Sequence, residues 1–269
     1  MELYDLFLRF MPLWLVFVIT VIIVLLSVYI GYRLGKFMRN RNKDGRDIFS
    51  GSVVTASLGL LAFMLAITFS IAANRYSERK QLLLDEVNTI STTYLQADFL
   101  PETSGDAIKK LLREYVDLRA SLIEKGKWSK SNNIQEVINK AESVQSKLWS
   151  YTVPLGRQYP NSETIGLFIS SLNELIDLQT ERIVVGLQYH IPGAIWGALY
   201  LLSILAFGLV GYELGSAQSG SVLVSIIMAL TFSTVIILIT DLDRPLQGHI
   251  EVSQKPMLQL QQKLSQEAP

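Results

Sequence analysis

The stretch GSVVTASLGLLAFMLAITFSIAA, Gly51 to Ala73, decides the fold. It contains no charged residue, and it is long enough to cross the hydrocarbon core of a bilayer as a helix, which takes about 20 residues. It continues into NRYSERKQLLLDEVNTISTTYLQADF, Asn74 to Phe99, without a glycine or proline between the two parts. We therefore predict one long helix, whose first half lies in the membrane and whose second half carries a helical domain outside it.

The composition agrees with a membrane protein. The chain has 269 residues, of which 49% are hydrophobic and 18% charged, and the mean hydropathy is +0.31, which is too apolar for an ordinary soluble enzyme. Lys+Arg and Asp+Glu both total 24, so no overall charge favours nucleic acid as a partner. Cysteine is absent, which excludes disulfides and thiolate chemistry. The histidines, His190 and His249, lie outside any ligand-spaced motif, so we predict no metal or other cofactor.

Three further apolar stretches are predicted to cross the membrane. They are Pro12 to Leu34, Gly193 to Leu214 and Ser221 to Thr240. The predicted fold class is an all-α membrane protein with four transmembrane helices and a four-helix extramembrane domain inserted between the second and third spans. The expected organisation is a first span and basic loop, a second span, a helical domain, a third and fourth span, and a C-terminal tail, over residues 1–47, 51–73, 74–190, 191–241 and 242–269 respectively.

The extramembrane segment shows helical periodicity throughout. The first helix has a coiled-coil-like apolar seam formed by Tyr76, Leu83, Val87, Ile90, Tyr94 and Ala97. Further helices are predicted from about Asp106 to Gly126, from Asn132 to Tyr151, and from an N-cap at Asn161 or Ser162 to His190. Pro154 and Pro160 are expected to bracket a loop, and Ile191-Pro192 to interrupt the helix before the third span. Pro245 should end the last span, and the tail segment HIEVSQKPM is compatible with either a short strand or an extended segment.

Gly31 and Gly35 form a G-x-x-x-G pattern at the end of the first span, a weak indication of helix contact. Six basic residues then follow between Arg33 and Arg46. The positive-inside rule places this basic loop, residues 36–47, in the cytoplasm. Arg75, Arg79 and Lys80 beyond the second span oppose this orientation. A patch for lipid headgroups, which carries no information on orientation, is the other reading of the loop.

The second span has two distinct faces on a helical wheel. Small residues gather on one side, with leucines towards the other; the small residues are Ser52, Ala56, Gly59, Ala62, Ala66, Ser70 and Ala73. Such a face indicates close helix packing, or else a conduction path with an apolar constriction. The residues proposed for a pore or its neck are Gly59, Phe63, Met64, Ala66 and Phe69.

A cluster of charges follows the fourth span. Asp241 and Asp243 stand at a helix C-terminus, where the helix dipole disfavours carboxylates, so we expect them to need nearby cations. Arg244, together with Arg75 and Arg79 at the end of the second span, supplies the candidates. The cluster is interpreted either as an interfacial network that fixes helix depth or as an ion-attracting vestibule.

Four stretches carry a resemblance to a known family. They are GLLAFMLAITFSIAANRYSERKQLLLDEVNTISTTYLQADFLPE from Gly59, LREYVDLR from Leu112, LNELIDLQTER from Leu172, and DLDRPLQGHIEVSQKPM from Asp241. Together they resemble the bestrophin-like family of bacterial membrane proteins, whose function is largely uncharacterised and which is distantly similar to the bestrophin anion channels.

This resemblance implies a homo-oligomeric ion channel, a pentamer by analogy, that favours anions and lies in the bacterial inner membrane. Its partners would be membrane lipid, copies of itself and small ions. The second span would line a pore with an apolar neck. Bestrophins keep the soluble domain in the cytoplasm, which conflicts with the orientation of the basic loop. The chain has no acidic run after the last span, and Asp241 and Asp243 alone do not carry over the calcium clasp of animal bestrophins.

A second hypothesis is a membrane-anchored interaction or sensor protein in which the long helix binds a partner and nothing crosses the membrane. An enzyme is not expected, because no nucleophile or base accompanies the two carboxylates.

Overall fold

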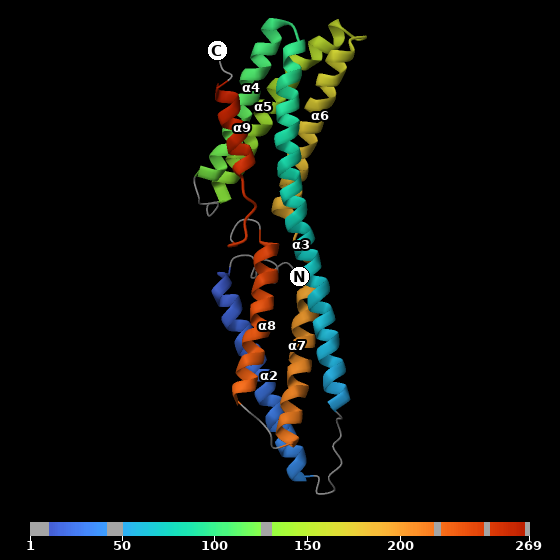
Figure 1. Cartoon of the computed structure of the whole chain (residues 1–269), viewed down its shortest axis with the longest axis vertical. Coiled ribbons are helices and arrows are strands. Elements are labelled where there is room, and N and C mark those ends of the chain that lie inside the picture. Colours follow the sequence, from blue (N-terminus) through green and yellow to red (C-terminus); the bar gives the residue numbers. More distant parts are fainter. Residues whose placement is uncertain (1–10, 42–50, 125–130, 218–221, 245–247, 267–269) are drawn as a thin grey trace. The chain divides into compact units, whose positions relative to one another are not determined.

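The computed structural model describes residues 11–41, 51–124, 131–217, 222–244 and 248–266 (Figure 1). Within these ranges all regular structure is helical. The chain forms two compact units. The membrane unit comprises Met1–Arg75, His190–Arg244 and Gly248–Ile250, and the helical domain comprises Tyr76–Tyr189, Pro245–Gln247 and Glu251–Pro269.

The membrane unit contains the four predicted spans. They are α2 (Leu13–Arg41), the first part of α3 (Gly51–Gln96), α7 (Gly193–Ser216) and α8 (Val222–Asp243). All four are long and apolar enough to cross a membrane. The all-α class with four spans is therefore confirmed. The long helix is also confirmed, because α3 runs for 46 residues without a break and contributes to both units.

Glycines bring α2 and α7 into backbone contact. A Cβ atom added at Gly31 would overlap the carbonyl oxygen of Gly208, and one added at Gly211 would overlap that of Val28. Gly35 and Gly215 make the same kind of close approach one turn further along. Helices associate in lipid through such close packing of small residues, because lipid provides no hydrophobic drive between them. The G-x-x-x-G pattern of the first span therefore does mark a helix contact, against a matching set of glycines in α7.

Arg39 fixes one end of this helix pair. Its Nη1 atom donates hydrogen bonds to the carbonyl oxygens of Gly215, at 3.1 Å, and Ser216, at 3.4 Å. These carbonyls belong to the last turn of α7 and have no partner within the helix. A cation at a helix C-terminus is also favoured by the helix dipole.

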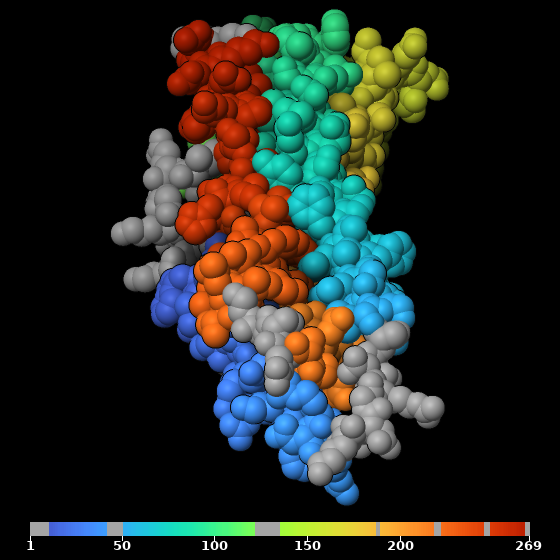
Figure 2. Space-filling model, turned by 60° about the horizontal axis from the view of Figure 1, so that its bottom comes forward, coloured from blue at the N-terminus to red at the C-terminus, as the bar shows by residue number. Residues whose placement is uncertain are grey.

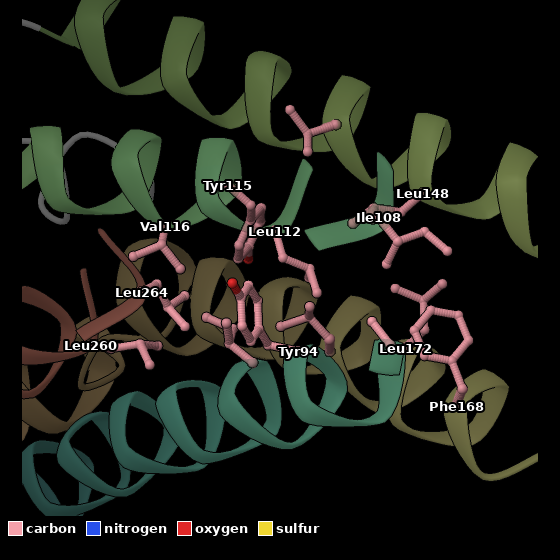
Figure 3. Packing of buried hydrophobic residues seen from close by; sticks show 14 of the residues in the cluster. Tyr94, Ile108, Leu112, Tyr115, Val116, Leu148, Phe168, Leu172, Leu260 and Leu264 are labelled. Carbon is pink, nitrogen blue, oxygen red and sulfur yellow. The ribbon is translucent and has the colours of Figure 1, made fainter. Parts of the chain in front are cut away.

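The helical domain packs around a large apolar core, and a small separate cluster is formed by Leu82, Leu178 and Val185. The domain is built from the second part of α3, the turn η1 (Ala97–Phe99), α4 (Glu102–Glu124), α5 (Ser131–Gln158), α6 (Glu163–Ile183), the π-helical turn η2 (Val184–Gln188) and α9 (Lys255–Gln266). The predicted seam of α3 faces this core, since Leu83, Ile90, Tyr94 and Ala97 are all buried in it. Figure 3 shows Tyr94 among side chains of α4, α6 and α9. The seam therefore stabilises the fold of one chain.

One local prediction is wrong, and another holds only in part. Pro154 lies inside α5 and does not end a helix; Thr152 and Leu155 on either side of it are buried, so packing outweighs the lost backbone hydrogen bond. In the tail, residues 248–254 form neither helix nor strand, in line with the extended alternative, but Lys255 to Met257 of the quoted segment already belong to the helix α9. Helix α9 buries Met257, Leu260 and Leu264 in the core, and Figure 3 shows Leu260 and Leu264 there.

Other boundaries agree with the sequence. Ser162 is the N-cap of α6 and accepts a hydrogen bond from the amide of Ile165 at 3.4 Å. The helix stops after η2 and resumes at Gly193, following Pro192 as the N-cap, so the interruption at Ile191-Pro192 is confirmed. The expected ends at Gly126 and Pro245 lie outside the described residues.

Candidate functional site

The membrane part of α3 buries one face and exposes the other. Val54, Leu61, Thr68 and Ala72 are buried, and at about 100° per residue they form a single stripe. The roughly opposite side carries the predicted small residues, of which Ser52, Ala56, Gly59, Ala62, Ala66 and Ser70 are exposed and Ala73 is half-buried. We call Ala56, Gly59, Ala62, Phe63, Ala66 and Ser70 the open face of α3. This light-blue segment is visible at the surface in Figure 2.

Four of the five residues proposed for a pore lie on the open face or at its border. Phe63 is 60% exposed and Phe69 39% exposed; Ala66 and Gly59 are also exposed. A Cβ added at Gly59 would meet no described atom within 4 Å. Met64 is half-buried beside the buried stripe. Gly59, Ala62 and Ala66 are therefore not used for packing within the described part of the protomer, whereas Ala72 and Ala73 nearer the helical domain are buried or half-buried.

The charged end of α8 binds backbone amides of the chain. Asp243 accepts hydrogen bonds from the amide of Ile191 at 3.0 and 3.2 Å, where the chain enters α7. Asp241 accepts one from the amide of His249 at 2.7 Å. A Cβ added at Gly248 would overlap Oδ1 of Asp241, so a side chain at this position would displace the carboxylate. The two carboxylates hold the start of the third span and the segment that leaves the fourth.

Arg244 supplies the positive charge next to these carboxylates. It is 6% exposed and donates a hydrogen bond to the carbonyl oxygen of Met11. Burial lowers the pKa of Arg244 from its ordinary value, and the negative charges of Asp243 and Asp241 act in the opposite direction. Arg244 is therefore one of the cations expected near Asp241 and Asp243.

Arg75 and Arg79 lie on the same side of α3 as the buried stripe, when the helix is continued at about 100° per residue. Arg79 is 9% exposed, and Arg75 is half-buried. Nη1 of Arg75 is buried and has no hydrogen-bond partner among the described residues. Pairing of these arginines with Asp241 or Asp243 stays a prediction.

Sequence reasoning missed a buried ionic cluster in the helical domain. Glu86 of α3 is fully buried and accepts a hydrogen bond from the phenol of Tyr115 at 2.7 Å. Arg119 of α4 binds the same carboxylate through Nε, at 3.1 Å, and Nη2, at 3.2 Å. Arg182 of α6 forms a third contact through Nη1, and its Nη2 lies 3.5 Å from Oε1 of Gln254. One carboxylate thus links three helices.

Burial dominates the electrostatics of this Glu86 cluster. Burial raises the pKa of Tyr115 above its ordinary value of 10.0, against the opposing effect of the charge on Arg119. Burial also lowers the pKa of Arg182 to about 10. The cluster therefore carries two cations and one anion in surroundings that disfavour charge, which makes the carboxylate essential to it. A sequence signal exists, since Glu86 and Arg119 interrupt apolar helical stripes.

Comparison with known proteins identifies the family of this chain. The family described as a Bestrophin-like domain matches residues 11–257. The chain belongs to the bestrophin-like family. The matched range of this bestrophin-like chain includes the open face of α3, the Glu86 cluster and the end of α8. A comparison with curated proteins finds no match.

Solved structures share the bestrophin-like fold. A bacterial bestrophin homolog from Klebsiella pneumoniae is 17% identical with a TM-score of 0.62, over 94% of this chain and 97% of that one. A form of a Klebsiella pneumoniae bestrophin homolog carrying one substitution gives 17% identity and a TM-score of 0.60, over 94% and 99%. At this identity the likeness shows the fold. Within the described residues, no group of three or more His, Asp or Glu side chains is arranged to hold a metal ion.

Proposed function

We propose that this bestrophin-like protein is the protomer of a homo-oligomeric ion channel that favours anions, with the open face of α3 turned towards a central axis. By analogy with bestrophins the oligomer is a pentamer. The observation that carries the proposal is the exposure of the small residues of α3. A helix that buries Val54, Leu61 and Thr68 within its own protomer and exposes Gly59, Ala62 and Ala66 is suited to close approach by further copies.

Phe63 and Phe69 form the apolar constriction in this proposal. Both side chains are large, exposed and uncharged, and hydrophobic constrictions gate ion flow by losing water. The small residues between and around them leave room for the pathway. Phe63 lies at the centre of the open face, so its truncation is the direct test of the neck.

The anion preference rests on neutral donors and on positive charge behind them. The exposed side of α3 continues in the helical domain with Ser77, Asn88 and Thr92, whose hydroxyl and amide groups can donate hydrogen bonds to anions. Arg75 lies on the other side of the helix. It therefore acts in this proposal through its positive potential, without touching the ion.

The absence of cysteine from the natural chain gives a direct test. We would reconstitute Ala66→Cys in liposomes, measure chloride efflux, and add a charged methanethiosulfonate reagent. Leu205→Cys, on the exposed side of α7, is the matched control, because Leu205 is 55% exposed and belongs to another helix. Reagent should stop efflux through Ala66→Cys and leave the control unchanged, whereas Phe63→Ala should raise efflux.

The number of protomers in the oligomer is the second test of the channel proposal. Native mass spectrometry in detergent should give one closed oligomer with several protomers, and five copies would match the analogy. A monomer or a tight dimer, together with no efflux for any variant over a range of voltage and pH, would overturn the proposal that the protein is a channel. That result would favour a membrane-anchored interaction or sensor protein.

The orientation is proposed from the basic segment 36–47. The sequence predicts it as a loop after a span ending at Leu34, but its residues up to Arg41 are the last turns of α2; the positive-inside rule favours the cytoplasm of a bacterial inner membrane for this segment. The helical domain would then lie on the opposite side. Ser146→Cys introduces a thiol at an exposed position of α5. A membrane-impermeant maleimide should label it in intact spheroplasts; labelling only after lysis would place the helical domain in the cytoplasm and the basic loop outside.

A further inference from the structure

The outward side of α2 joins an apolar stripe to a basic one. Val18, Ile22, Leu26, Tyr29 and Ile30 are all exposed. The same side continues with the exposed residues Arg33, Lys36, Phe37 and Arg41, because all of these positions lie within one half of the helix circumference at about 100° per residue. We call Arg33, Lys36 and Arg41 the basic end of α2.

The basic end of α2 has no acidic partner among the residues that the structure describes. The helix Leu13–Arg41 contains no acidic residue. Among the described residues, Arg33, Lys36 and Arg41 form no ion pair, and the guanidinium of Arg33 lies over the ring of Tyr29, 6.0 Å from its centroid. The neighbouring α7 carries Glu213 near its end. Its Oε1 atom would lie 3.1 Å from a Cβ at Gly51, so this carboxylate is turned towards the start of α3.

The length of α2 places these cations at the depth of lipid headgroups. A helix of 29 residues is about 43 Å long at 1.5 Å per residue, whereas the hydrocarbon core is about 30 Å thick. Trp14, which is 64% exposed, lies at the opposite end and suits the other interface. Arg33 and Lys36 therefore follow directly after the hydrocarbon-spanning part.

We propose that the basic end of α2 binds the headgroup of an acidic phospholipid, whose acyl chains lie along Ile22, Leu26 and Ile30. The phosphate accepts hydrogen bonds from Arg33 and Lys36, and Arg41 contributes charge from the next turn. Arg39 takes no part, because it is engaged with the last carbonyls of α7. This site is separate from the open face of α3, and its occupation does not depend on whether the protein conducts ions.

The test measures which lipids the full-length protein retains. The protein is reconstituted in vesicles of equal phosphatidylglycerol and phosphatidylcholine, extracted in mild detergent and washed, and its bound lipids are quantified by mass spectrometry. Arg33→Gln, Lys36→Gln and Arg41→Gln are combined in one variant. The control variant combines Lys80→Gln, Lys110→Gln and Lys147→Gln, which removes the same charge from exposed positions of the helical domain.

Wild type and control should retain phosphatidylglycerol in preference to phosphatidylcholine, and the α2 variant should lose this preference. A basic residue near an anionic surface changes the preference about fivefold, so the combined loss should exceed fivefold. Equal retention by the α2 variant and wild type, an equal loss in the control, or no preference in wild type would each overturn the proposal. If the triple variant does not insert into the membrane, the double variant Lys36→Gln/Arg41→Gln replaces it in the same assay. Its loss of phosphatidylglycerol preference should be smaller.

Discussion

Replacing Glu86 by glutamine tests the buried cluster of the helical domain. The substitution keeps the shape of the side chain and removes its charge. Arg119, at 8% exposed, and Arg182, with 17% of its side chain exposed, would then remain as neighbouring buried cations without their carboxylate. The amide group of glutamine would also turn a donor towards one guanidinium or towards the phenol of Tyr115.

The expected loss of stability follows from the two arginines that would remain without their carboxylate. Removal of one partner from a buried ion pair typically costs about 3–5 kcal/mol, because an uncompensated charge remains. Here two cations share the carboxylate, so a value at the upper end is expected. For a domain of this size, about 1 kcal/mol corresponds to a few degrees in Tm, and Glu86→Gln should lower the Tm of the helical domain by on the order of 10 °C.

The assay is thermal unfolding of the full-length protein in detergent, followed by circular dichroism. Lys140→Gln is the matched control. It also breaks a carboxylate pair, with Glu136, but both of those side chains are more than half exposed, so its cost should stay below about 0.5 kcal/mol. A double-mutant cycle with Arg182→Gln measures the coupling directly.

Arg182→Gln should cost much less in the Glu86→Gln background than in wild type, with a coupling of at least about 1 kcal/mol. Two results would refute the reasoning. One is a Tm of Glu86→Gln equal to that of the Lys140→Gln control. The other is strict additivity in the cycle, which would mean that the two side chains do not stabilise each other in solution.

Three further outcomes are expected. Gly211→Ala should lower the Tm of the membrane unit by several degrees because the new Cβ meets backbone of α2, whereas Gly197→Ala, with nothing within 4 Å, should be neutral or slightly stabilising; equal effects would contradict the glycine contact. Asp243→Ala should cost about 1–3 kcal/mol, because the buried amide of Ile191 loses its acceptor, and an unchanged Tm would contradict that role. Because burial raises the pKa of Tyr115, its contribution is complete below pH 10.0 and is lost as the pH rises through the folded-state value; wild type should therefore lose more stability than Tyr115→Phe between pH 9 and 11, and parallel losses would refute this assignment.

The helices and their membrane location could be predicted because they depend on local pattern. An uncharged run from Gly51 to Ala73 has few stable states other than a helix in lipid, and the seam of α3 shows its period directly. Predictions failed where packing overrode a local signal. Pro154 remains within α5 because buried neighbours hold the helix together, and α9 forms because Met257, Leu260 and Leu264 pack into a core contributed by distant segments.

The sequence by itself determined the four spans, the long α3 and the family, since apolar length and helical period are properties of consecutive residues. Only the tertiary structure decided which face of α3 is open, which glycines of α7 meet Gly31, and that Glu86 gathers two arginines from α4 and α6. Each of these depends on the rotation and register of one helix against another, which are fixed by the sum of many contacts between distant residues. A single stretch of sequence does not contain that sum.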